Sequence, residues 1–261
     1  MINYFEFYFT KKKFGQNFLK NSETAFQIVN FLELKNCKTI LEIGPGMGAL
    51  TKHILNINEF EKIFIEVDNE CCDYLENILP EIEGKIINVD FLKYNLSSLE
   101  NPIAVIGNFP YNISSQILFR IIENLESISE MVGMFQYEVA ERISSAFGSK
   151  KYGILSVLIQ AFFKVEIKMK LKPDSFFPPP KINSAIIHLK KITNNIDCDK
   201  QLFIKVVKLS FNQRRKTLRN SLKSFKIDDN IKEDLIFEKR AEELKVKDFI
   251  YLTNLISNGN I

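Results

Sequence analysis

One short segment restricts the fold of this chain more than any other part of it. Residues 39–43, Thr-Ile-Leu-Glu-Ile, are mostly apolar or β-branched, and they lead directly into a loop with glycine at positions 44, 46 and 48. Residues 49–55 then have the apolar spacing of a helix. A strand, a glycine loop and a helix in this order form the opening unit of a sheet of parallel strands.

The same alternation continues beyond this unit, where apolar runs of strand length are separated by helical patterns. Because strands that alternate with helices pair in parallel, the pattern predicts an α/β fold with a doubly wound sheet. The expected strands are residues 63–67, 85–89, 103–106 and 131–135, and the expected helices are residues 70–79, 113–125 and 138–146.

Residues 154–191 are expected to complete this sheet. A helical pattern at 154–163 precedes a run at 164–171 in which charged and apolar residues alternate, and residues 184–189 resemble a partner strand for that run. The segment between these strands, Phe-Phe-Pro-Pro-Pro at 176–180, is predicted to be a stiff surface segment, because proline is excluded from helix interiors and central strands.

A second domain is predicted at the end of the chain. The polar residues 193–197 are the best candidate for a linker, and the pattern beyond them is helical throughout. We therefore expect a domain at residues 1–192 that carries the sheet, and a small helical domain at residues 193–261. A domain of that size has a minimal core and is stabilised by packing on its neighbour.

Composition excludes several classes of protein. Hydrophobic residues make up 46% of the 261 residues and charged residues 26%, as in globular proteins. The four cysteines and two histidines have no metal-binding spacing, so we expect free thiols and neither a bound metal nor metal-dependent hydrolysis. No uncharged apolar run approaches the roughly 20 residues that span a bilayer. We therefore expect a soluble cytoplasmic protein without membrane contacts.

Charge is strongly segregated along the chain although the net charge is only +3. Residues 59–100 hold 11 acids and three lysines, whereas residues 181–226 hold 12 lysines and arginines and only two aspartates. A basic segment of this size is typical of proteins that bind a polyanion such as nucleic acid. The alternative, a solvated basic surface without a ligand, stays open on charge alone.

The glycine loop is compatible with two kinds of ligand. Read as Gly44-x-Gly46-x-x-Ala49, it satisfies the fingerprint of dinucleotide-binding enzymes, so an NAD or FAD enzyme has to be considered. Against that stand an acid inside the first strand, Glu42, and acids at the ends of the next two strands, Glu66 and Asp90. A carboxylate at Glu66 suits ribose hydroxyls, and one at Asp90 suits an adenine amine, so the pattern favours a nucleoside site. Either acid alone could instead be a solubilising residue.

The most specific motif is Asn108-Phe109-Pro110-Tyr111, at the end of the fourth expected strand. The exocyclic amine of adenine is a poor nucleophile because its lone pair is delocalised into the ring. The Asn108 side-chain oxygen and the Phe109 carbonyl, held rigid by Pro110, could accept the two amine hydrogens, while Tyr111 offers a stacking face. The competing interpretation is an ordinary turn that caps a helix at Asn112.

In these motifs the sequence resembles the ribosomal RNA adenine N6,N6-dimethyltransferases, and among them the bacterial enzymes that modify 16S RNA of the small subunit. The resemblance covers nearly the whole chain. Its motifs stand at residues 14–19, 42–48, 66–68, 90, 107–114, 135–140, 152–156, 177–181 and 211–222. Two positions depart from the family pattern, because Phe109 stands where leucine is common and Tyr137 where lysine is usual. No family counterpart is identified for the first ten residues.

The resemblance implies a Rossmann-like class I methyltransferase sheet with a small helical domain, and S-adenosylmethionine as the methyl donor. Asn17 and Leu19 would close over the donor, and Gly44 and Gly46 would line its methionine part. Glu66 would hold the ribose and Asp90 the adenine amine. Asn108 would lie between donor and target. The implied reaction adds two methyl groups to N6 of each of two adjacent adenines in the 3′-terminal hairpin of 16S RNA.

The resemblance also implies the partner. Arg214, Arg215, Lys216 and Arg219 are expected to lie on one helix face and to contact ribosomal RNA phosphates in a small-subunit particle, with the protein acting as a monomer. Two alternatives remain open. One is a 23S RNA dimethyltransferase of the macrolide-resistance type, and the other is a ribosome-assembly or transcription accessory factor that keeps the fold without turnover.

Overall fold

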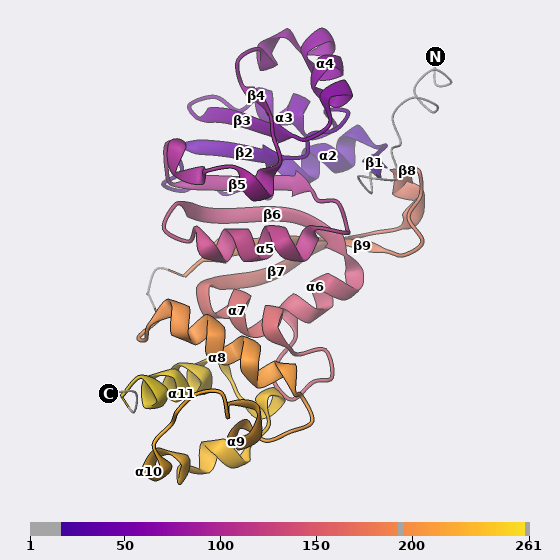
Figure 1. The fold of residues 1–261 in the computed structure, drawn as a ribbon. Helices are drawn as coiled ribbons and strands as arrows, with labels where there is room; N and C mark the ends of the chain where they lie inside the picture. The colour runs from indigo at the N-terminus through magenta and orange to yellow at the C-terminus, as the bar shows by residue number, and fades with distance from the viewer. Residues whose placement is uncertain (1–16, 193–195, 259–261) are drawn as a thin grey trace. The chain divides into compact units, whose positions relative to one another are not determined.

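The computed structural model describes residues 17–192 and 196–258, which form two compact units (Figure 1). The first unit runs through Ala140 and resumes at Glu166–Lys191, and the second combines Glu141–Val165 with the chain from Ile192 onward. The chain enters the second unit at Glu141, leaves it after Val165 and returns to it at Ile192, next to the boundary predicted after residue 192. Residues 141–165, which the sequence pattern assigned to the sheet domain, cluster with the C-terminal helices. Residues 1–10 and the start of the expected linker lie outside the described residues.

The first unit is built on a seven-stranded sheet in the order β4-β3-β2-β5-β6-β9-β7. The strands from β2 to β6 pair in parallel, as the alternation of strands and helices predicts, and β2 is buried along its whole length. The strands are β2 (Thr39–Ile43), β3 (Glu61–Glu66), β4 (Ile86–Asn88), β5 (Ile103–Asn108), β6 (Ile128–Gln136), β7 (Phe163–Leu171) and β9 (Ser184–Lys191).

One strand departs from the expected parallel sheet, because β9 runs antiparallel to β6. Residues 172–183 connect β7 to its neighbour β9 and contain no α-helix, whereas a parallel connection between two strands of a sheet normally needs a crossover helix. The orientation of β9 has a consequence for function, since its first residue lies at the edge of the sheet where the parallel strands end.

Helices cover the sheet on both sides, and Figure 1 shows α5 crossing the face turned toward the viewer. The amphipathic pattern explains their docking, because the buried residues of α5 are apolar except for Ser114. The helices of this part are α2 (Ser22–Val29), α3 (Thr51–Leu55), α4 (Asn69–Ile78) and α5 (Ser114–Glu123), with short 3₁₀ turns at Pro80–Ile82, Phe91–Lys93, Leu96–Ser98 and Pro173–Ser175. Helix α6 (Tyr137–Ser144) begins in the first unit and ends in the second.

A second, two-stranded sheet joins β1 (Phe18–Leu19) to β8 (Phe176–Phe177) in antiparallel register. The prediction of a surface segment at 176–180 is therefore wrong for its first residue. The Phe176 ring is fully buried in the core of the first unit, whereas Phe177 is half-buried. The pairing gives Leu19 a fixed place beside the main sheet.

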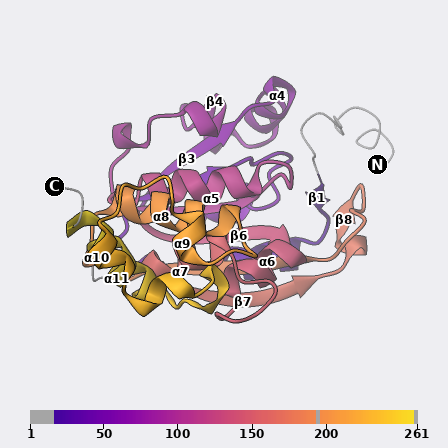
Figure 2. The same cartoon turned by 60° about the horizontal axis from the view of Figure 1, so that its bottom comes forward.

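The second unit is helical, as the pattern beyond the linker predicts (Figure 2). Its core is aromatic, because the Phe211 ring stacks on Phe249 at 5.9 Å between centroids, and Phe162 of α7 meets Phe203 of α8 edge-on at 6.1 Å. Its elements are α7 (Ile154–Phe162), α8 (Lys200–Asn212), α9 (Leu218–Ser221), α10 (Asp229–Lys232) and α11 (Val246–Asn258), with 3₁₀ turns at Leu235–Glu238 and Ala241–Glu243. None of the helices in the described ranges has both the length and the apolar composition to cross a membrane.

Candidate active site

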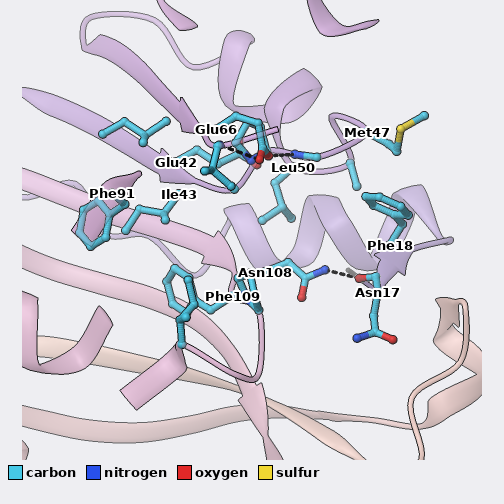
Figure 3. A pocket seen from close by; sticks show the side chains of 18 of the residues that line it. Asn17, Phe18, Glu42, Ile43, Met47, Leu50, Glu66, Phe91, Asn108 and Phe109 are labelled. Carbon is cyan, nitrogen blue, oxygen red and sulfur yellow. Dashed lines mark hydrogen bonds between the residues drawn. The ribbon is translucent and has the colours of Figure 1, made fainter. Parts of the chain in front are cut away.

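A pocket of about 240 Å³ opens at the carboxyl edge of the main sheet, within the first unit (Figure 3). Its wall is formed by β1, the glycine loop after β2, the end of β3 and the segments that follow β4 and β5. This is the position at which open α/β sheets bind their ligands. The site residues expected in the first unit all line it: Asn17, Leu19, Gly44, Gly46, Glu66, Asp90, Asn108, Phe109, Pro110 and Tyr111.

The glycine loop needs glycine for two different reasons. Gly44 and Gly46 have φ values of +69° and +56°, in the left-handed region where a side chain is strained. A Cβ on Gly46 would also stand 2.9 Å from Cε1 of Phe18 on β1. The loop therefore keeps its backbone open toward the pocket while β1 closes tightly against it.

Glu66, at the end of β3, is the anchor of this loop. Its Oε2 accepts a hydrogen bond from the Gly46 amide at 3.0 Å, and its Oε1 accepts from the Val67 and Asp68 amides at 2.8 and 3.0 Å. The residue is only 5% exposed, so the alternative of a solubilising acid is wrong here. Burial raises the pKa of Glu66 above its usual range. Three of roughly four lone-pair positions are occupied, and the carboxylate keeps capacity for a further donor.

Glu42 is a pocket residue that the sequence analysis used as an argument but did not name as part of the site. It lies inside the buried strand β2, 1% exposed, and accepts a hydrogen bond from Thr51 Oγ at 2.8 Å. Burial raises the pKa of Glu42 to about 8; the Thr51 bond opposes this shift, and the nearby Glu66 charge adds to it. Glu42 is therefore mostly a neutral acid at pH 7. An acid inside an otherwise apolar strand was the signal.

The protonation of Glu42 predicts how stability depends on pH. The folded protein holds this proton up to about pH 8, whereas the unfolded chain releases it near 4.5, so folding binds a proton between these values. Stability should fall as pH rises across that window, by up to about 1.4 kcal/mol per pH unit. Urea unfolding of wild type and Glu42→Gln between pH 5 and 8 checks this. The variant, which cannot titrate, should show a shallower slope, and parallel curves would refute the assignment.

Asp90 and Leu19 take the expected places around the pocket with different degrees of burial. Asp90 is half-exposed, and its Oδ1 accepts from the Leu92 amide at 2.9 Å, which leaves the other oxygen available. Leu19 is buried and belongs to β1, opposite Phe176 of β8. An acid and an apolar wall thus flank the glycine loop.

Asn108, the last residue of β5, is held by a long-range hydrogen bond. Its Nδ2 donates to the main-chain carbonyl of Asn17 at 2.7 Å, across 91 residues of sequence (Figure 3). Because the amide nitrogen is engaged, the orientation of the group is fixed and Oδ1 is left as an acceptor at the pocket wall. A turn does follow the motif, because the Ile113 amide donates to the Pro110 carbonyl at 3.2 Å. The capping part of the alternative interpretation is wrong, since α5 begins at Ser114 with no side-chain cap and Asn112 is not its N-cap.

Phe109 and Tyr111, which follow Asn108 in the motif, contribute to the pocket in different ways. The Phe109 ring is 1% exposed and packs against Phe135 at 5.3 Å between centroids. A Cβ on Gly107 or Gly133 would lie 2.6 or 2.3 Å from this ring, so both glycines make room for it. With the ring buried in the sheet, only the backbone of Phe109 can face a ligand. Tyr111 is half-buried, and its hydroxyl lies 2.6 Å from Ser184 Oγ.

The basic residues of the second unit do not form the helix face that the sequence analysis expected. Helix α8 ends at Asn212 and α9 begins at Leu218, so residues 213–216 form a turn. At the break, the backbone of Gln213 leaves the helical region, with φ −121° and ψ 59°. The expected face is therefore wrong, although all four cations lie in this region.

The four cations fall into two pairs by their contacts. Arg214 bonds to Glu242 at 2.6 Å and to the Ser149 carbonyl, and Arg219 bonds to Glu238 at 2.8 Å and to the Lys232 carbonyl. Arg215 and Lys216 are exposed, and neither has an ion pair with any residue that the structure describes. Only the second pair is fully available to an external phosphate.

Comparison with known proteins gives a consistent result. The family model for "Ribosomal RNA adenine dimethylase" matches residues 9–258. The chain is 50% identical to "Ribosomal RNA small subunit methyltransferase A" of Flavobacterium johnsoniae, over 96% of this chain and 97% of the relative. It is 47% identical to the protein of the same name from Cytophaga hutchinsonii, over 95% of this chain and 97% of that one.

Solved structures agree in fold. A dimethyladenosine transferase from Plasmodium falciparum matches 93% of this chain and 98% of its own, with a TM-score of 0.80 and 25% identity. The 23S rRNA methyltransferase ErmE matches with a TM-score of 0.69 at 22% identity, over 92% of this chain and 100% of its own, and shares the fold. The expected methyltransferase sheet is confirmed. The chain belongs to the ribosomal RNA adenine dimethylase family.

Proposed function

We propose that this protein dimethylates N6 of two adjacent adenines in the 3′-terminal hairpin of 16S ribosomal RNA, with S-adenosylmethionine as methyl donor. The observation that carries the proposal is the fixed amide of Asn108. Its nitrogen is held by the Asn17 carbonyl, and its oxygen is left as an acceptor at the wall of the pocket. Two relatives named small subunit methyltransferase A, 50% and 47% identical to this chain, support the choice of RNA.

The pocket residues fit this donor. The open backbone at Gly44 and Gly46 suits the methionine part, the remaining acceptor capacity of Glu66 suits a ribose hydroxyl, and the second oxygen of Asp90 suits an adenine amine. Leu19 and the Asn17 backbone would close the site. When bound, the donor supplies a methyl group on a positively charged sulfur.

The residues after β5 would prepare the acceptor. Asn108 Oδ1 and the Phe109 carbonyl accept hydrogen bonds from the two N–H groups of the adenine amine, which turns its lone pair toward the donor. Tyr111 provides a face on which the flipped base stacks and so offsets the few kcal/mol that flipping costs. A general base is not required, because the product ammonium can lose its proton to water.

The RNA footprint is proposed to include Arg215 and Lys216, which are exposed and form no ion pair with the residues that the structure describes. Arg214 and Arg219 act in support, because their guanidinium groups are bonded to Glu242 and Glu238. We propose that the protein acts in the cytoplasm and as a monomer.

The test uses radiolabelled S-adenosylmethionine with small-subunit particles or with large-subunit RNA. Both substrates come from a strain whose 16S and 23S RNA lack adenine dimethylation. We expect dimethyladenosine in the small-subunit RNA alone, identified by chromatography of the nucleosides.

A second experiment tests the RNA footprint. The double variant Arg215→Gln/Lys216→Gln should bind the particles more weakly, and the slope of log K against log salt concentration should become shallower by about 2. Arg214→Gln is the matched control and should leave that slope nearly unchanged.

Each other outcome has a definite meaning. Label in large-subunit RNA would assign the protein to the macrolide-resistance type, and stable particle binding without label would favour an accessory factor. If neither labelling nor particle binding occurs, the proposed function is wrong. An unchanged salt slope for the double variant would remove Arg215 and Lys216 from the footprint.

A further inference from the structure

The Tyr111 side chain at the pocket makes a hydrogen bond that the proposed reaction does not explain. The Tyr111 hydroxyl and Ser184 Oγ lie 2.6 Å apart although 73 residues separate them in sequence. Ser184 is fully buried, whereas Tyr111 is half-buried and lines the pocket. The bond therefore links a residue at the ligand site to one inside the sheet.

The topology of the sheet explains how the two residues meet. Strand β6 lies between β5 and β9, and β9 runs antiparallel to it. Ser184 is the first residue of β9 and pairs with Gln136, the last residue of β6. The Tyr137 amide, which follows, donates to the Asn183 carbonyl at 2.9 Å and holds the start of β9 in place. Ser184 is thus a rigid anchor at the edge where the pocket opens.

Such an anchor matters because of how a tyrosine side chain moves. The ring turns about two torsions, and holding its far end at a fixed point sets its tilt and direction. Ser114 also contacts Tyr111, but through the main-chain carbonyl at 3.2 Å, so it acts on the loop and not on the ring. Among the described residues, Ser184 is the hydroxyl partner of the ring itself.

We propose that Ser184 is a positioning residue that holds the Tyr111 ring in the orientation in which it stacks on the target adenine. This inference rests on the proposed function and deepens it. Ser184 touches neither donor nor base. It acts through Tyr111, so its loss should affect the use of RNA and leave the affinity for the donor unchanged.

Two substitutions break the same bond from opposite ends. Ser184→Ala removes the anchor, and Tyr111→Phe keeps the ring but removes its hydroxyl. We expect each to lower kcat/KM for small-subunit particles about tenfold, since a misplaced group can cost up to about 10²-fold, while the donor Kd from calorimetry stays within about twofold. The double variant should be no worse than either single variant, because only one interaction is lost. Ser184→Thr, which keeps a hydroxyl, should recover most of the activity.

The controls separate positioning from simple loss of structure. Ser114→Ala removes another buried hydroxyl bonded to Tyr111 and should change kcat/KM little. If Ser184→Ala fails to fold, Tyr111→Phe alone still decides, since wild-type kcat/KM in that variant would overturn the proposal. Multiplicative losses in the double variant would also overturn it. An inactive wild type would instead refute the proposed function, so the two failures are distinguishable.

Discussion

Replacing Asn108 by alanine should reduce the rate constant of methyl transfer by about 10²- to 10³-fold. The change removes the acceptor proposed for one amine hydrogen, and the loss of a single oriented hydrogen-bonding group at a reaction centre costs about 10² to 10³. It also removes the hydrogen bond to the Asn17 carbonyl, which holds the segment before β1 against the end of β5. Single-turnover kinetics on small-subunit particles would measure the effect.

Asn108→Gln is the informative control for this prediction. It retains both amide groups but moves them by one methylene, and a displacement of about 1 Å is expected to cost about 10²-fold. Donor affinity, measured by calorimetry, should fall by less than about tenfold in both variants. An alanine variant that keeps more than about a tenth of wild-type kcat would show that Asn108 does not hold the target amine.

Replacing Glu66 by alanine should weaken the binding of S-adenosylmethionine by about 10²-fold or more. A hydrogen bond to a charged group contributes about 1.5–3 kcal/mol, and this change removes the proposed ribose acceptor together with the anchor of the glycine loop. The Gly46, Val67 and Asp68 amides would all lose their partner. Calorimetric titration gives the affinity directly.

Glu76→Ala is the matched control, because it removes the same charge from the exposed face of α4 in the same unit. It should bind the donor as wild type does.

Thermal unfolding in the presence of S-adenosylmethionine or of NAD tests the class of cofactor. S-adenosylmethionine should raise the Tm of wild type, and NAD should not. Stabilisation by NAD alone would restore the dinucleotide interpretation of the glycine loop.

The basic turn shows where reasoning from the sequence reached its limit. Four cations lie within the six residues 214–219, and their spacing suggested one helical face. The acids that bind Arg214 and Arg219 lie 28 and 19 residues further along the chain, at Glu242 and Glu238. An ion pair between residues so far apart leaves no trace in the local spacing of residues. The sequence pattern therefore could not distinguish the arginines that form ion pairs from the cations that do not.

The pocket itself was largely predictable. Strand ends in a parallel sheet share one edge, so an acid or amide that directly follows an apolar run can be assigned to that edge from sequence. Glu66, Asp90 and Asn108 all followed this rule, and all three line the pocket. Glu42 does not follow this rule, because it lies inside a strand. Its pKa of about 8 results from burial, which only the packed sheet creates.

The sequence by itself determined the alternation of strands and helices, the glycine loop and the family, because each depends on residue types at short and fixed spacing. The tertiary structure alone decided which atoms are occupied and which are available. It ties the Asn108 amide to Asn17, joins Tyr111 to Ser184 at the start of an antiparallel strand, and buries Phe176. These contacts join residues far apart in the chain, and only the packing of the folded sheet brings them together.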